Sequence, residues 1–224
     1  MKKIIFVLIL VLPAMVFSYA GMLDDFDTAI KLAQIEDKEA IVMFSDTSCV
    51  YCVKFVKETL SDGTVEDLLR AGFVFSQIYK SNPGTASYMV GEEMKEMTYN
   101  DLYAYFQIRG TPTLWFFTTE GALLTNLPGF VPANDFVPIL RFIGEKAYES
   151  TTFDVFRSKS SDYMGNAKIV RVNEEEYNYV LENDPIALEY EGQDVDIYTV
   201  WLTKDESTAE ELLEEGVFRV ILLN

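Results

Sequence analysis

Two cysteines, Cys49 and Cys52, are the residues of this 224-residue sequence best suited to chemistry. They are the only cysteines in the chain and stand three positions apart, as Cys49-Val50-Tyr51-Cys52. A thiol attacks only as its thiolate, so a reactive cysteine needs a lowered pKa. The first turn of a helix lowers it, because unpaired N–H groups and the helix dipole favour negative charge there. We therefore expect Cys49 to attack, and Cys52 on the same helical face to form the disulfide that releases the substrate.

Three other interpretations of the cysteine pair stay open. A zinc site would need two more soft or imidazole ligands, and the chain has no histidine and no third cysteine, so we expect no metal. A purely structural disulfide is the second, although so short a loop would restrict the unfolded chain relatively little. The third is a degenerate site that no longer catalyses thiol–disulfide exchange.

Composition excludes two broad classes of protein. The chain is 49% hydrophobic and 14% aromatic, which is enough apolar material for a folded core rather than a disordered chain. The 18 basic and 36 acidic residues give a net charge of −18. Such a surface repels the phosphate backbone, so we expect no nucleic-acid partner.

The first 20 residues have the pattern of a signal peptide. A basic start, Met1-Lys2-Lys3, precedes an apolar run over 4–17, and small residues stand at Ser18 and Ala20. The run is short for a membrane span, which needs about 20 apolar residues. We expect cleavage near Ala20 and a periplasmic or otherwise exported protein, in a compartment that permits disulfides. The alternative is a membrane anchor formed by an uncleaved signal.

The chain that follows alternates helical and strand patterns. The cysteine pair opens a helix directly after the apolar strand. Pro138 fits the last helix only if it lies in the first turn, where a missing N–H is tolerated. We expect helices at 24–38, 49–60, 65–70, 100–106 and 135–147, strands at 40–44, 73–79, 113–118 and 122–127, and a long loop over 81–97.

A polar break over 158–162 separates a second, smaller pattern. Ser207 with Glu210 matches a capping box and predicts the start of its last helix. We expect strands at 168–172, 186–190, 197–202 and 217–223, and helices at 173–181 and 207–215. The predicted organisation is a signal peptide (1–20), a first domain (21–150), a linker (151–167) and a small α/β domain of unknown role (168–224).

Two separated segments resemble the thioredoxin superfamily, in particular its exported bacterial members. They are AIVMFSDTSCVYCVKFVKETL at 40–60 and IRGTPTLWFF at 108–117, followed by Gly121 and by Pro128-Gly129-Phe130. The resemblance covers about residues 24–148. It implies an α/β, thioredoxin-like fold, extended here by the small C-terminal α/β module.

The resemblance also implies roles for individual residues. Cys49 would be the nucleophile and Cys52 the resolving cysteine. Thr111-Pro112 would be joined by a cis peptide bond, with the backbone of Thr111 pairing with substrate, and Tyr51 would join them in substrate binding. The chain departs from the family pattern at Ser48, where a tryptophan is usual, and at Met43, where a buried aspartate is usual. No histidine stands between the cysteines, which argues against a very strong oxidant.

These features predict a thiol–disulfide oxidoreductase, and the weakly stabilised thiolate favours a reductase of protein disulfides. Its cofactor would be only its own redox-active disulfide, Cys49–Cys52. Its partners would be disulfide-containing proteins and, as the resemblance implies, a membrane thiol-electron donor. The alternative is a non-catalytic binding module that docks a partner through its acidic surface and C-terminal domain.

Overall fold

The computed structural model describes residues 19–224, so the predicted signal peptide lies outside the described residues except for Tyr19 and Ala20. None of the helices within residues 19–224 combines the length and the hydropathy that a membrane span requires. Tyr19 is buried, and its ring packs edge-on against Phe75 with the ring centroids 6.1 Å apart. Cleavage after Ala20 would therefore remove a side chain from the core.

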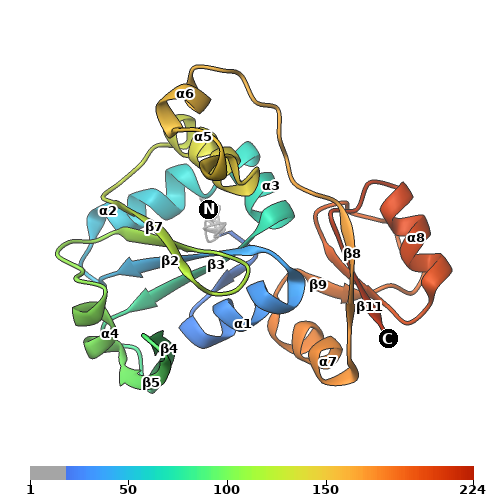
Figure 1. Cartoon of the computed structure of the whole chain (residues 1–224), viewed down its shortest axis with the longest axis horizontal. Coiled ribbons are helices and arrows are strands. Elements are labelled where there is room, and N and C mark those ends of the chain that lie inside the picture. The colour runs from blue at the N-terminus through green and yellow to red at the C-terminus, as the bar shows by residue number, and fades with distance from the viewer. Residues whose placement is uncertain (1–18) are drawn as a thin grey trace, which may run out of the picture.

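A five-stranded mixed sheet forms the centre of the first part of the chain (Figure 1). β2 (Glu39–Ser45) runs parallel to β3 (Phe73–Tyr79) and antiparallel to β6 (Thr113–Phe117), and all seven residues of β2 are buried. Because helices cover both faces of the sheet, residues 40–44 of this strand are a continuous apolar run rather than an alternating one. In spatial order the strands are β1 (Met22–Leu23), β3 (Phe73–Tyr79), β2 (Glu39–Ser45), β6 (Thr113–Phe117) and β7 (Leu123–Pro128).

Helices pack on both faces of this sheet. α1 (Phe26–Glu36) and α4 (Tyr99–Tyr105) cover one face. α2 (Val50–Lys54), the π-helix η1 (Phe55–Thr59), α3 (Gly63–Gly72) and α5 (Ala133–Gly144) cover the other. The predicted helix over 49–60 thus begins as an α-helix and continues as a π-helix. The arrangement confirms the expected α/β fold.

The loop predicted over 81–97 is wrong, because this segment folds into a hairpin. β4 (Thr85–Val90) and β5 (Glu93–Thr98) pair antiparallel, and Gly91 takes a φ of 68° in the turn between them. Ala86 and Tyr88 are buried on one face, while their neighbours along β4 are exposed. Alternation over so few residues, several of them small or polar, is a weak signal in the sequence.

Two predicted helix features also differ in the structure. Pro138 is the sixth residue of α5 rather than part of its first turn. Its missing N–H leaves the carbonyl of Asn134 without a helical partner, and Asn134 is exposed to water that can bind this group. The capping box at Ser207 is also wrong, because Asp205 caps α8 (Glu206–Glu214) by accepting the Thr208 N–H.

The last part of the chain forms an all-parallel sheet of four strands, in the order β8 (Lys168–Val172), β11 (Arg219–Leu223), β10 (Val200–Thr203) and β9 (Ala187–Glu189). α7 (Glu174–Asn183) packs between this sheet and α1, and α8 covers its other face (Figure 1). The expected linker, 151–167, contains α6 (Phe153–Arg157) and is tied to α5, since Arg141 Nε donates to the Tyr163 carbonyl at 3.0 Å.

Charged residues are buried where the two parts meet. Lys38 Nζ lies 2.8 Å from Glu36 Oε2, and both side chains are at most 1% exposed. Asp184 lies close to this pair, and burial followed by the charge of Glu36 raises its pKa well above the usual range. At the edge of the junction, Lys31 Nζ lies 3.8 Å from the centroid of the Tyr179 ring. The C-terminal module therefore shares a core with the first sheet and is not simply tethered to it.

Glu39, the first residue of β2, predicts a pH dependence of stability. Burial raises its pKa from the ordinary value of 4.5 to about 7. Between these two values the folded protein binds more protons than the unfolded chain. The contribution of Glu39 to the free energy of unfolding is therefore highest below about pH 4.5 and falls by roughly 3 kcal/mol as the pH rises through 7.

Urea unfolding at pH 5 and pH 8 tests this prediction. Glu39→Gln should be less sensitive to pH than the wild type over this interval and should gain relative stability at pH 8. Glu93→Gln, on the exposed strand β5, is the matched control and should keep the wild-type dependence. Parallel profiles for the wild type and Glu39→Gln would show that Glu39 does not titrate in this way.

Candidate active site

A short polar turn carries the chain from β2 to the cysteine pair. The Ser48 N–H and the Ser48 hydroxyl both donate to Asp46 Oδ1, at 2.8 Å and 2.6 Å. The Cys49 N–H donates to the Asp46 carbonyl at 3.0 Å. These bonds reverse the chain at the end of the sheet and place Cys49 at the N-cap of α2.

The two cysteines form a disulfide in the structure, with their Cα atoms 5.3 Å apart. The Cys52 N–H donates to Cys49 Sγ at 3.0 Å, so this sulfur occupies the place of a capping oxygen. Cys49 is partly exposed, whereas Cys52 is only 1% exposed. Of the two sulfurs, Cys49 Sγ is therefore the one that a substrate can reach.

The loop before β6 brings Thr111 and Pro112 beside the cysteine pair. The peptide bond between them is cis. Cys49 Sγ lies 3.2 Å from the carbonyl oxygen of Thr111. The loop is held by two bonds at its base: the Thr113 hydroxyl donates to the Gly110 carbonyl, and the Gly129 N–H donates to the Pro112 carbonyl, both at 2.8 Å. The structure thus joins two segments that lie about 60 residues apart in the sequence.

An exposed apolar surface adjoins Cys49. Val50 is 76% exposed and Tyr51 is 61% exposed, and the Tyr51 ring lies 6.5 Å from that of Phe130. Lys54 Nζ lies 4.4 Å from the centroid of the same Phe130 ring. Exposed apolar side chains gathered beside a reactive group are typical of surfaces that contact other macromolecules. Sequence reasoning used Phe130 only for the resemblance and missed its place beside Tyr51.

Among the described residues, no charged side chain hydrogen-bonds to Cys49 Sγ. The hydrogen bonds from Ser48 lower the pKa of Asp46, so this carboxylate is ionised at neutral pH. Met43, at the position where the family pattern usually has a buried aspartate, is fully buried and brings no carboxyl group near Cys52. A Cys49 thiolate would therefore take its direct support from the Cys52 N–H and the helix start. Residues 19–224 contain no cluster of three or more acidic, histidine or cysteine side chains that could hold a metal ion.

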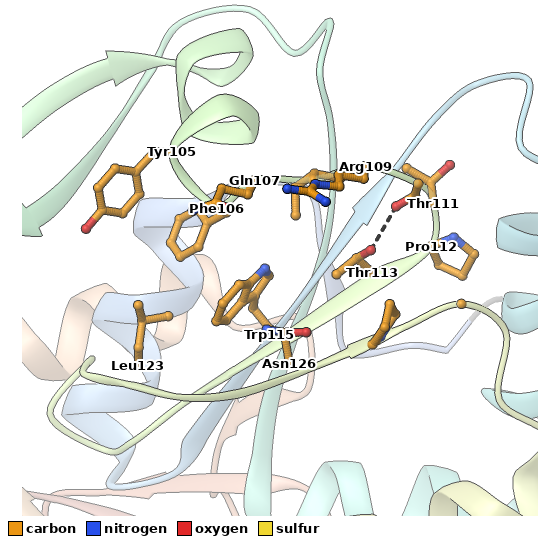
Figure 2. A pocket seen from close by; sticks show the side chains of 14 residues that line it. Tyr105, Phe106, Gln107, Arg109, Thr111, Pro112, Thr113, Trp115, Leu123 and Asn126 are labelled. Atoms are coloured by element: carbon orange, nitrogen blue, oxygen red, sulfur yellow. Dashed lines mark hydrogen bonds between the residues drawn. The ribbon is translucent and has the colours of Figure 1, made fainter.

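Two hollows meet at the loop over 108–111. One, of about 540 Å³, contains Cys49, Tyr51 and Thr111 in its wall. The other, of about 730 Å³, extends from Pro112 along β6 to the side chains of Trp115 and Leu123 (Figure 2). Trp115 is only partly buried and forms part of this wall, with its ring 5.2 Å from that of Phe106.

One protein family matches the part of the chain that contains this site. The family described as "Thioredoxin-like domain" matches residues 26–144, slightly more than half of the chain. Comparison with curated proteins finds no significant match. A thioredoxin-fold protein from Helicobacter pylori is 20% identical with a TM-score of 0.47, over 71% of this chain and 98% of its own.

Two further solved structures show the same kind of similarity. A thioredoxin from Thermus thermophilus is 25% identical with a TM-score of 0.44, over 54% of this chain and 84% of its own. The C-terminal domain of DsbD from Neisseria meningitidis, in its reduced form, is 20% identical with a TM-score of 0.39, over 50% of this chain and 89% of its own.

The matched segment contains both the cysteine pair and the loop with the cis-proline. A disulfide at the start of a helix in such a domain supports thiol–disulfide oxidoreductase chemistry. On the match over residues 26–144, this chain belongs to the thioredoxin-like family.

Proposed function

We propose that this protein reduces disulfides of other proteins outside the cytoplasm. The observation that carries the proposal is the position of Cys49 Sγ, partly exposed at the N-cap of α2 and bonded to the buried sulfur of Cys52. A sulfur in this position combines access for a substrate with a local preference for negative charge. The neighbouring Cys52 can end the reaction without a second protein.

The reaction has two exchange steps. The Cys49 thiolate attacks one sulfur of the substrate disulfide, forming a mixed disulfide while the other substrate sulfur leaves as a thiolate. Cys52 then gives its proton to water and attacks Cys49 Sγ, which closes the disulfide seen in the structure and releases the second substrate thiolate. Two electrons pass from the protein to the substrate, and solvent protonates both substrate thiolates.

We assign substrate positioning to Thr111, Pro112 and Tyr51. The carbonyl of Thr111 lies beside Cys49 Sγ, so its backbone can pair with an extended substrate segment as that segment approaches the sulfur. Pro112 fixes the shape of this loop, and the exposed ring of Tyr51 offers apolar contact on the other side of Cys49. Each role can be tested separately from the chemistry of the cysteines.

The surroundings of Cys49 favour reduction over oxidation. A strong oxidant needs a reduced form stabilised by a strongly favoured thiolate. Here one backbone N–H and a helix start support the thiolate directly, and the ionised Asp46 lies three residues before it. Lys80 and Arg109 in the adjoining hollow are exposed, so water and salt screen their effect on the thiolate. The buried Cys52 thiol has no carboxyl group at Met43 to assist its deprotonation. These features predict a low reduction potential.

The location and the source of electrons are part of the proposal. The pattern of residues 1–20 favours an exported protein, either cleaved near Ala20 or held at the membrane by an uncleaved signal. Outside the cytoplasm the oxidised protein would need a supply of electrons. We propose a membrane thiol-electron carrier, which would exchange its own dithiol for the Cys49–Cys52 disulfide.

A second candidate function is a binding module without turnover. It is favoured by the acidic chain and by the C-terminal module, which contributes no wall residue to either hollow beside the loop over 108–111. In that case the disulfide would only fix the start of α2. Cysteine substitutions separate the two candidates.

Insulin reduction with dithiothreitol as electron donor provides the first test. Cys49→Ser should reduce the rate to that of dithiothreitol alone, because it removes the attacking sulfur. Cys52→Ser, reduced beforehand and freed of dithiothreitol before insulin is added, should instead accumulate a mixed disulfide between Cys49 and insulin, visible on a non-reducing gel and abolished by reduction. Equal rates for the wild type and Cys49→Ser would favour the binding module.

The reduction potential of the Cys49–Cys52 couple provides the second test. Equilibration against glutathione or dithiothreitol buffers should give a value near −270 mV, the range of a reductase. A value near −120 mV would indicate an oxidase and overturn the proposed direction while leaving the exchange chemistry intact. Asp46→Asn should raise the potential, because it removes the negative charge nearest in sequence to the thiolate.

A further inference from the structure

The hollow beside Cys49 is basic, although the chain as a whole is acidic. The net charge is −18, yet Lys80 and Arg109 both line this hollow, and Asp46 is the only acidic residue in its wall. Both cations are exposed, and neither makes an ion pair within residues 19–224. Lys80 and Arg109 can therefore pair with a negatively charged group of a substrate.

Asp46 does little to neutralise these two cations. Its Oδ1 already accepts two hydrogen bonds from Ser48, which direct the carboxylate towards its own turn. Lys80 follows the end of β3, and Arg109 lies in the loop before β6, so the two come from separate segments that meet at the edge of the sheet where Cys49 lies. The hollow thus combines one reactive sulfur with a surplus of positive charge.

The second hollow is apolar and shares Arg109 with the first. Figure 2 shows Phe106, Trp115 and Leu123 towards one end of it and Thr111 and Pro112 at the other, with Arg109 between them. Tyr105 and Leu123 are each 40% exposed, so their apolar surface faces water. An apolar side chain placed here would cover that surface, at a gain of about 25 cal/mol for each Å² removed from water.

Because the two hollows adjoin, together they predict what kind of molecule binds there. They share residues 108–111, the segment that contains Thr111 beside Cys49 Sγ. An extended polypeptide that crosses this segment can place one side chain in the basic hollow and another, a few residues away, in the apolar one. A small disulfide could not occupy both while its sulfur reaches Cys49.

We infer that the substrates are polypeptide disulfides with an acidic side chain next to the attacked cysteine and an apolar side chain a few residues further along. The inference rests on the proposed function, since it concerns the same sulfur. Lys80 and Arg109 would attract and orient the acidic side chain, which mainly accelerates association. Phe106, Trp115 and Leu123 would hold the apolar one.

Four synthetic peptides test the inference, each containing one intramolecular disulfide. They differ in the residue beside the cysteine, aspartate or lysine, and in the residue placed for the apolar hollow, leucine or serine. The readout is the second-order rate constant for oxidation of the pre-reduced full-length protein at low salt. The aspartate–leucine peptide should react about tenfold faster than the lysine–leucine peptide, and the advantage should shrink at 1 M salt.

Substitutions in the protein locate the effect. In the double variant Lys80→Ser/Arg109→Ser, the ratio of aspartate to lysine rates should fall to near 1. The matched control is Lys95→Ser/Lys159→Ser, which removes the same charge from exposed positions that line neither hollow and should keep the wild-type ratio. Leu123→Ser should reduce the ratio of leucine to serine rates.

The outcomes separate this inference from the proposed function. If the wild type reduces neither the peptides nor the small neutral disulfide bis(2-hydroxyethyl) disulfide, the proposed function itself fails. If all four peptides are reduced at equal rates, the chemistry holds and the inference is overturned. A charge preference that persists in Lys80→Ser/Arg109→Ser would also overturn it, because the attraction would then come from elsewhere.

Discussion

The hydrogen bond from the Cys52 N–H to Cys49 Sγ is the interaction on which the site depends. It exists only because a helix begins at Cys49, and the helix begins there because the Asp46 turn ends β2 and reverses the chain. β2 in turn is fixed by neighbours on both sides and by helices on both faces. The direction of the Cys52 N–H is therefore set by the position of β2 in the first sheet.

The loop on the other side of Cys49 is positioned by other elements of the fold. The loop with Thr111 and Pro112 is anchored by bonds to Gly110 and Gly129, so its position follows from β6 and β7 rather than from α2. The C-terminal module packs against α1, away from α2 (Figure 1). Glu36, Lys38 and Asp184 are buried together at this junction. The C-terminal module shares an apolar core with the first sheet without supplying a residue to the wall around Cys49.

The parts of the fold with strong local patterns could be predicted from sequence. The apolar run of β2, the cysteine pair at a helix start and the proline segment before β6 are each readable from adjacent residues. The hairpin β4–β5 was missed because its alternation is short and partly polar, and the cap of α8 was misplaced by two residues because Asp205 and Ser207 are both good caps. The basic hollow needed the structure, since Lys80 and Arg109 meet only through the order of the strands.

The rate of alkylation of Cys49 as a function of pH tests the central claim most directly. Reduced protein is treated with iodoacetamide between pH 4 and 10, and mass spectrometry follows the label on Cys49. The account predicts an inflection clearly below the ordinary cysteine pKa of about 8.5, because the helix start and the Cys52 N–H stabilise the thiolate. An inflection at or above 8.5, or a Cys49 that reacts only after unfolding, would contradict it.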